Sequence, residues 1–157
     1  MGTEDGVRRV IINADDFGYS FGVNSGIREA IDHGVVTSTS VMVKRIAASE
    51  ASEMAKRKDI SLGLHLDMTE EGLERWLGMI ALSFWPIDGV QKEFDTQVQK
   101  FKHLTGRLPD HIDSHHNIHR VLPNWRNVTQ RFSREHGIPV RSVDAKFVMS
   151  FFWQVIY

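Results

Sequence analysis

Strand-like and helix-like segments alternate along this chain, and this alternation limits its fold more than any other feature of the sequence. Short β-branched runs are each followed by a segment whose apolar residues recur every three or four positions. The pattern predicts strands at residues 7–14, 35–43, 60–66, 109–115 and 138–143, and helices at 22–34, 48–59, 90–106 and 122–137. Because strand–helix–strand units pack as right-handed parallel crossovers, we expect an α/β fold, either an open doubly wound sheet or part of a β/α barrel.

Size and charge narrow the class of protein further. The chain has 157 residues, the size of one domain, and we expect residues 1–157 to form a single domain. Its 19 basic and 20 acidic residues are balanced, which argues against a nucleic-acid partner. The aromatic run at residues 147–157 is too short to span a membrane, and no signal-peptide-like apolar run begins the chain. With no cysteine either, we expect a cytoplasmic protein without a membrane partner.

Polar side chains gather where three of the predicted strands end. Two adjacent aspartates follow the first strand, a histidine lies in the third, and a run of histidines and aspartates follows the fourth. Because the carboxyl ends of parallel strands share one edge, these side chains are expected to converge. The residues concerned are Asp15, Asp16, His65, Asp113, His115, His116 and His119.

Each of these residues taken alone has an ordinary structural reading. An aspartate after a strand can cap a turn or helix, and a histidine among leucines can be a core residue. The dense cluster in residues 110–119 exceeds what packing requires. The separation of His115 and His119 fits one helical turn, whereas an extended chain would put Asp113 and His115 on one face. Both arrangements are open from the residues alone.

Two neutral imidazoles and a carboxylate form a site for a divalent cation with positions left for water. One of the two adjacent aspartates would then be the anionic ligand, and the other a general base that accepts a proton from water. Both can face one site only where the first strand breaks, and the Phe17–Gly18 step is expected to supply that break. The sequence therefore predicts a metal-dependent hydrolase.

Three stretches of the sequence closely resemble the YdjC-like carbohydrate deacetylases, a family that includes the chitooligosaccharide deacetylases. They are IINADDFGYSFGVNSGIREAIDHGVVTSTSVMV, SLGLHLDMTEEG and TGRLPDHIDSHHNIHRVLP. The resemblance implies an incomplete β/α barrel that removes acetyl groups from N-acetylated oligosaccharides. It makes Asp15 the catalytic base and Asp16, His65 and His115 the metal ligands. It places Asp113, His116 and His119 around the ligands or the sugar. The metal would be Mg²⁺ or Zn²⁺, with Mn²⁺ and Co²⁺ as alternatives.

The chain also departs from the family's pattern. Family members continue well beyond this length and carry a proton-donating histidine in an HPG-like motif, which is absent here. The chain thus resembles an N-terminal portion of the fold. An alternative function is a catalytically impaired metal- or sugar-binding fragment, and another is a metal-dependent phosphoesterase. A partial barrel would leave a sheet edge open, and that edge or the tail at 147–157 could form a homo-oligomer contact.

Overall fold

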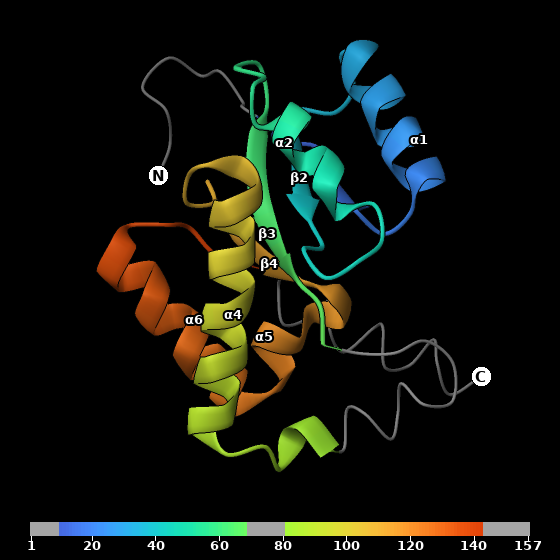
Figure 1. Ribbon diagram of the computed structural model, residues 1–157. Coiled ribbons are helices and arrows are strands. Elements are labelled where there is room, and N and C mark those ends of the chain that lie inside the picture. The colour runs from blue at the N-terminus through green and yellow to red at the C-terminus, as the bar shows by residue number, and fades with distance from the viewer. Residues whose placement is uncertain (1–9, 69–80, 143–157) are drawn as a thin grey trace, which may run out of the picture.

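Four parallel strands form one sheet in the order in which they occur in the chain. The computed structural model describes residues 10–68 and 81–142 (Figure 1). The strands are β1 (Asn13–Phe17), β2 (Ser38–Val41), β3 (Ser61–Leu66) and β4 (Ile112–Ser114), each paired in parallel with the next. This is the α/β architecture that the alternation predicts, and an open sheet of this order is consistent with part of a β/α barrel.

Helices connect the strands and pack beside the sheet. Figure 1 shows α4 and α6 side by side, with α2 lying near β2 and α1 at the far end of the sheet. The helices are α1 (Phe21–Asp32), α2 (Ala51–Met54), α4 (Ile87–Thr105), α5 (Ile118–Val121) and α6 (Pro123–His136), and short 3₁₀ turns cover Ala48–Glu50 and His115–Asn117. No helix among the described residues is both long enough and apolar enough to cross a bilayer. The cytoplasmic location stays a prediction.

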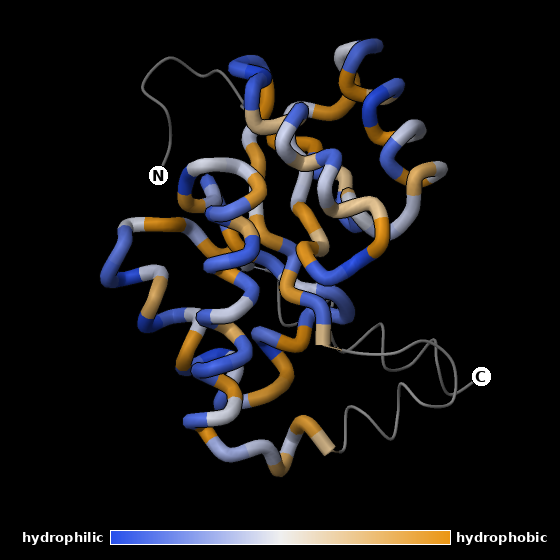
Figure 2. The backbone as a smooth tube through the Cα atoms, viewed as in Figure 1, coloured by the Kyte–Doolittle hydropathy of each residue, from blue (hydrophilic) through white to orange (hydrophobic). Residues whose placement is uncertain are grey.

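The two faces of the sheet differ in chemistry. On one face Leu62, Leu64 and Leu66 of β3 are fully buried and belong to one hydrophobic core with Phe94 and Phe101 of α4. Figure 2 shows the matching pattern, with apolar positions of α4 facing inward and polar positions outward. Because side chains alternate along a strand, every second residue of the same strands lies on the opposite face. The hydrophobic effect therefore stabilises the sheet mainly from its helix-covered face.

The opposite face of the sheet carries mostly polar residues. The side chain of Asn13 bonds with the hydroxyls of Ser38 and Ser40, and Ser40 in turn contacts His65 and Asp113. We call this surface the polar face of the sheet. Its members are Asn13, Asp15, Ser38, Ser40, Ser61, Gly63, His65, His111 and Asp113. The face runs along all four strands and ends in the cluster of acidic and histidine residues described below.

The first strand begins later than the sequence predicts. We expected a buried strand over residues 7–14, but β1 begins at Asn13, and Val10, Ile11 and Ile12 are 73%, 80% and 44% exposed. The partner strand explains the difference, because β2 offers pairing only from Ser38, which lies opposite Asn13. Apolar β-branched residues predict a strand only where a neighbour is available to pair with them.

The predicted fifth strand is reduced to one bridge. Val140 pairs with Ile112 as an isolated parallel bridge, flanked by hydrogen bonds from Ile112 N–H to the Pro139 carbonyl and from Arg141 N–H to the Ile112 carbonyl. Proline has no N–H to donate, so a regular ladder cannot run through Pro139. The prediction of a regular strand here was wrong, although the chain does lie beside β4.

Two helices also differ in length from their predictions. The helix expected at 48–59 is a 3₁₀ turn followed by the four residues of α2, whereas α4 begins three residues earlier than predicted, at Ile87. Pro86 directly precedes α4 in an extended conformation, with φ −63° and ψ 149°, and its ring fixes the φ angle. The tail at 147–157 lies outside the described residues. The tail's proposed role in oligomer contacts stays a prediction.

Candidate metal centre

The two adjacent aspartates face one site because the strand that carries them is irregular. Asp16 has a φ angle of 68°, in the left-handed region, and the pairing of β1 with β2 shifts register between Ala14 and Phe17. An irregularity of this kind interrupts the alternation of side chains, and aspartate tolerates the left-handed conformation better than most residues. The break therefore lies at Asp16, before the Phe17–Gly18 step that we expected.

The turn after β1 is held in place by a glycine and a buried asparagine. Gly18 has a φ angle of 97°, and a Cβ atom there would lie 2.9 Å from the Met42 carbonyl oxygen, so only glycine fits. Asn24 is fully buried in α1, accepts a 2.6 Å hydrogen bond from Gly18 N–H and donates to the Ala47 carbonyl and to Glu50. These contacts fix the turn that follows the aspartates.

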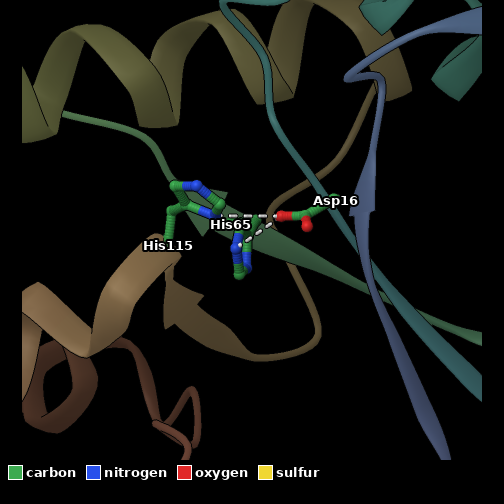
Figure 3. Close-up of side chains that lie close together, drawn as sticks. All are labelled: Asp16, His65 and His115. Carbon is green, nitrogen blue, oxygen red and sulfur yellow. Dashed lines mark ion pairs between the residues drawn. The ribbon is translucent and has the colours of Figure 1, made fainter. Parts of the chain in front are cut away.

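Three side chains from three strand ends meet around one oxygen atom. The Oδ1 atom of Asp16 lies 3.1 Å from Nε2 of His65 and 3.2 Å from Nδ1 of His115 (Figure 3). Asp16 comes from β1 and His65 from β3, and His115 directly follows β4. Two ligand atoms about 2.1 Å from one cation and 90–110° apart lie roughly 3.0–3.4 Å from each other. The observed spacing matches neighbouring positions around a divalent metal ion.

The hydrogen bonding of Asp16 also fits a metal ligand. Its Oδ1 atom is buried, and its contacts among the described residues are the ion pairs with His65 and His115. A buried carboxylate needs a compensating positive charge, which a bound divalent ion would supply once both imidazoles are neutral ligands. Two imidazoles and one carboxylate are a donor set suited to Zn²⁺ and other borderline cations. The residues present could therefore hold a divalent ion.

The acid–base properties of the site follow from these contacts. The approach of His115 and His65 holds the pKa of Asp16 well below its usual range, so this carboxylate stays ionised. Burial acts to lower the pKa of His65, but its pairing with Asp113 and Asp16 outweighs burial and raises the pKa to about 9. In the metal-free protein at neutral pH, His65 is therefore a cation.

Metal uptake is expected to release a proton from His65. A ligating imidazole must be neutral, so at any pH below about 9 the ion has to displace the proton that His65 carries. The apparent affinity should rise about tenfold per pH unit between pH 6 and 8 for one displaced proton. Titration calorimetry in buffers of different ionisation enthalpy measures this proton count. An affinity independent of pH would contradict the binding of the ion by a His65 that carries a proton in the metal-free protein.

Asp113 lies behind His65 and holds its ring. Its Oδ1 atom accepts a 2.7 Å hydrogen bond from Nδ1 of His65, and its Oδ2 atom accepts a 3.0 Å bond from the Ser40 hydroxyl. The side chain of Asp113, which makes both of these hydrogen bonds, is only 1% exposed. A carboxylate in this position fixes the orientation of a ligating imidazole and leaves Nε2 free to face the ion.

Asp15 points to the same site but is paired with an arginine. Its two oxygens accept hydrogen bonds of 2.7 Å and 2.6 Å from the guanidinium of Arg141, and Asn13 donates a third. Burial acts to raise the pKa of Asp15, but the Arg141 bond and the nearby His65 outweigh it and lower the pKa. We did not identify Arg141 from the sequence. Its place within the predicted fifth strand was the one signal that could have indicated it.

The remaining histidines occupy different positions from one another. The helical turn that would align His115 with His119, one of the two arrangements left open by the sequence, does not form, because His116 and Asn117 both have φ angles of 55°. His119 is buried, with Nδ1 2.5 Å from the Ser114 hydroxyl and Nε2 donating to the Arg141 carbonyl. His116 lies against His115, with ring centroids 3.9 Å apart. His119 therefore supports the main chain near the site and does not reach the three donors.

The fold and this donor cluster define an α/β protein with a candidate metal site at the carboxyl ends of its strands. The family model of the YdjC-like proteins matches residues 9–153, and the chain belongs to this family.

Proteins of known name support this membership. The chain is 35% identical over 158 residues to a chitooligosaccharide deacetylase of Citrobacter koseri, covering 91% of this chain and 62% of the relative. It is 36% identical to a chitooligosaccharide deacetylase of Escherichia fergusonii, covering 85% of this chain and 59% of the relative. The chain spans about three fifths of the length of these relatives.

A solved structure has the same fold. It is a crystal structure from Enterococcus faecalis described as that of a cellobiose-phosphate cleavage protein. The TM-score is 0.73 at 34% identity, and the match covers 86% of this chain and 59% of the other. The sequence-based prediction of the family and of the α/β fold is thus confirmed.

Proposed function

We propose that this chain carries the metal site and the catalytic base of a carbohydrate deacetylase acting on N-acetylated sugars of the chitooligosaccharide type. The observation that carries the proposal is the meeting of Asp16, His65 and His115 around one carboxylate oxygen, with the Asp15 carboxylate directed to the same site. The relatives named chitooligosaccharide deacetylase support the reaction and the substrate class.

In this proposal Asp16, His65 and His115 hold the cation, and Asp113 keeps His65 oriented through Nδ1. When bound, a divalent ion would polarise the acetamide carbonyl and make a neighbouring water more acidic. The donor set admits Zn²⁺ as well as Mg²⁺, Mn²⁺ and Co²⁺.

Asp15 is the proposed general base. Its pKa is lowered, so it is ionised at neutral pH and can accept the proton of an attacking water. Its carboxylate is half-exposed, which leaves it accessible to water and substrate, whereas Asp113 is almost fully buried. This difference in exposure supports Asp15, rather than Asp113, as the group that exchanges protons with the reactants.

The charges of the site balance when a divalent ion is present. The carboxylates of Asp15, Asp16 and Asp113 contribute three negative charges, and Arg141 contributes one positive charge. A divalent ion with neutral His65 supplies the remaining two. Without the ion, protonated His65 offsets only one of them. The balance explains why a chain can place two adjacent aspartates at the end of a strand.

The test is acetate release from N,N'-diacetylchitobiose by the 157-residue chain, stripped of metal and then supplied with Mg²⁺, Mn²⁺, Co²⁺ or Zn²⁺. We expect turnover that requires added metal. Metal binding without acetate release would instead support the metal- or sugar-binding fragment. Hydrolysis of p-nitrophenyl phosphate in place of the sugar would support a phosphoesterase.

A further inference from the structure

Two overlapping sets of donors are present at the site, and they share His65. One set is Asp16, His65 and His115, and the other is Asp15, His65 and Asp113. In each set the candidate donor atoms lie within 4.8 Å of one another. The two adjacent aspartates are chemically identical, so something outside them must decide which one binds the ion and which one remains available as a base.

The guanidinium of Arg141 distinguishes the two aspartates. It forms a two-bond fork with Asp15, of 2.7 Å and 2.6 Å, and its Nη2 atom also lies 3.1 Å from Oδ2 of Asp113. Forked arginine–carboxylate pairs are among the strongest hydrogen-bonded contacts in proteins. Both carboxylates of the second set are therefore engaged by one cation, whereas no described arginine pairs with Asp16.

The hydrogen bonding of the two carboxylates differs accordingly. Each oxygen of Asp15 already accepts a charged hydrogen bond, so binding a metal ion would require breaking part of the fork. The Oδ1 atom of Asp16 instead faces the imidazole nitrogens of His65 and His115, which would bind the same ion, so uptake of the ion at Asp16 leaves the Arg141 fork intact. We propose that Arg141 selects Asp16 as the metal ligand by occupying Asp15, and thereby reserves Asp15 as the base.

The position of Arg141 is fixed by its own main chain. Its N–H donates a 2.9 Å hydrogen bond to the Ile112 carbonyl of β4, and its carbonyl accepts a 3.1 Å bond from Nε2 of His119. The Ser114 hydroxyl contacts the other nitrogen of the same ring. Arg141 is thus a positioning residue, held from β4 on one side and from the buried His119 on the other.

The test is a double-mutant cycle read out by Co²⁺ binding, and it needs no enzymatic activity. In the parent protein, Asp15→Asn should change the Co²⁺ dissociation constant by less than about threefold, because Asp15 is not a ligand. In an Arg141→Gln background Asp15 is released and can bind the ion, so the same Asp15→Asn change should weaken binding at least about tenfold. The visible absorption of Co²⁺ should also change in Arg141→Gln and revert when Asp15→Asn is added.

Matched variants distinguish the loss of the Arg141–Asp15 contact from a general destabilisation of the fold. Arg57 forms a similar fork with Asp59 on the surface, so Arg57→Gln should leave the effect of Asp15→Asn unchanged. Arg141→Lys keeps the charge but loses the fork. If Arg141→Gln does not unfold cooperatively, Arg141→Lys provides a second cycle, in which we expect partial coupling between positions 141 and 15. An equal effect of Asp15→Asn in all backgrounds would overturn the inference.

This inference rests on the metal centre proposed above, and one further variant distinguishes the failure of each. If Asp16→Ala leaves the affinity for Co²⁺ unchanged, the proposed metal centre itself is wrong. If Asp16→Ala abolishes binding while the Arg141 cycle shows no coupling, the metal centre stands and the selecting role of Arg141 does not.

Discussion

His65→Ala is expected to abolish metal binding by the protein. His65 belongs to both candidate donor sets, it is almost fully buried, and Asp113 fixes its ring with Nε2 directed at Asp16. Loss of a residue that only orients a metal ligand costs roughly 10–100-fold in affinity, and loss of the ligand itself should cost more than that. Titration calorimetry with Zn²⁺ or Co²⁺ measures the effect directly.

Two further variants make this result interpretable. His65→Ala also leaves the buried Asp113 carboxylate without one of its partners, which destabilises the fold independently of metal. His115→Ala removes a more exposed member of the same cluster, so it should weaken binding with a smaller cost in stability. His103 is exposed on α4, and His103→Ala should leave the affinity unchanged. Parent-like affinity in both His65→Ala and His115→Ala would refute the metal centre.

Asp15→Asn is expected to remove most acetate release while sparing metal binding. Asparagine has nearly the same shape as aspartate but cannot accept the proton of an attacking water. General-base catalysis contributes roughly 10²–10⁴-fold, so the rate constant kcat should fall by about that factor. Measuring kcat, KM and the metal affinity of the same preparation shows whether the loss lies in the chemical step.

A distant aspartate provides the control for this variant. Asp59 is paired with Arg57 on the surface, much as Asp15 is paired with Arg141, so Asp59→Asn removes a comparable fork away from the site. It should leave kcat unchanged. If Asp15→Asn retained full turnover, another residue would have to act as the base, and the assignment of Asp15 would be wrong.

The fold could be predicted from the sequence where local pattern and neighbouring strands agree. The strands β2 and β3 and the helices α1, α4 and α6 lie where apolar periodicity places them. The pattern was misleading at Ile11 and Val140. Ile11 is β-branched but has no strand opposite it, and Val140 follows a proline that cannot donate to a ladder. Strand formation depends on the partner strand, which a local pattern does not contain.

The candidate site, like the fold, could be predicted from the sequence only in part. The rule that parallel strands end at one edge brought together Asp16, His65 and His115, as expected. The helical-turn alternative for His115 and His119 does not occur, because two left-handed residues interrupt that turn. Arg141 lies 126 positions from Asp15 and was not foreseen. The pairing arises because the segment after α6 lies close to the end of β1. The assigned roles remain proposals.

Along β3, residues of the hydrophobic core alternate with residues of the polar face of the sheet. In β3, Leu64 and Leu66 are core residues, whereas His65 between them contacts Asp113 and Asp16. Stepping one position along the strand therefore exchanges a residue of the hydrophobic core for one of the proposed metal centre. Substitutions on the polar face would change the proposed site while leaving the residues of the hydrophobic core in place. A sheet built in this way can acquire new chemistry while its scaffold remains constant.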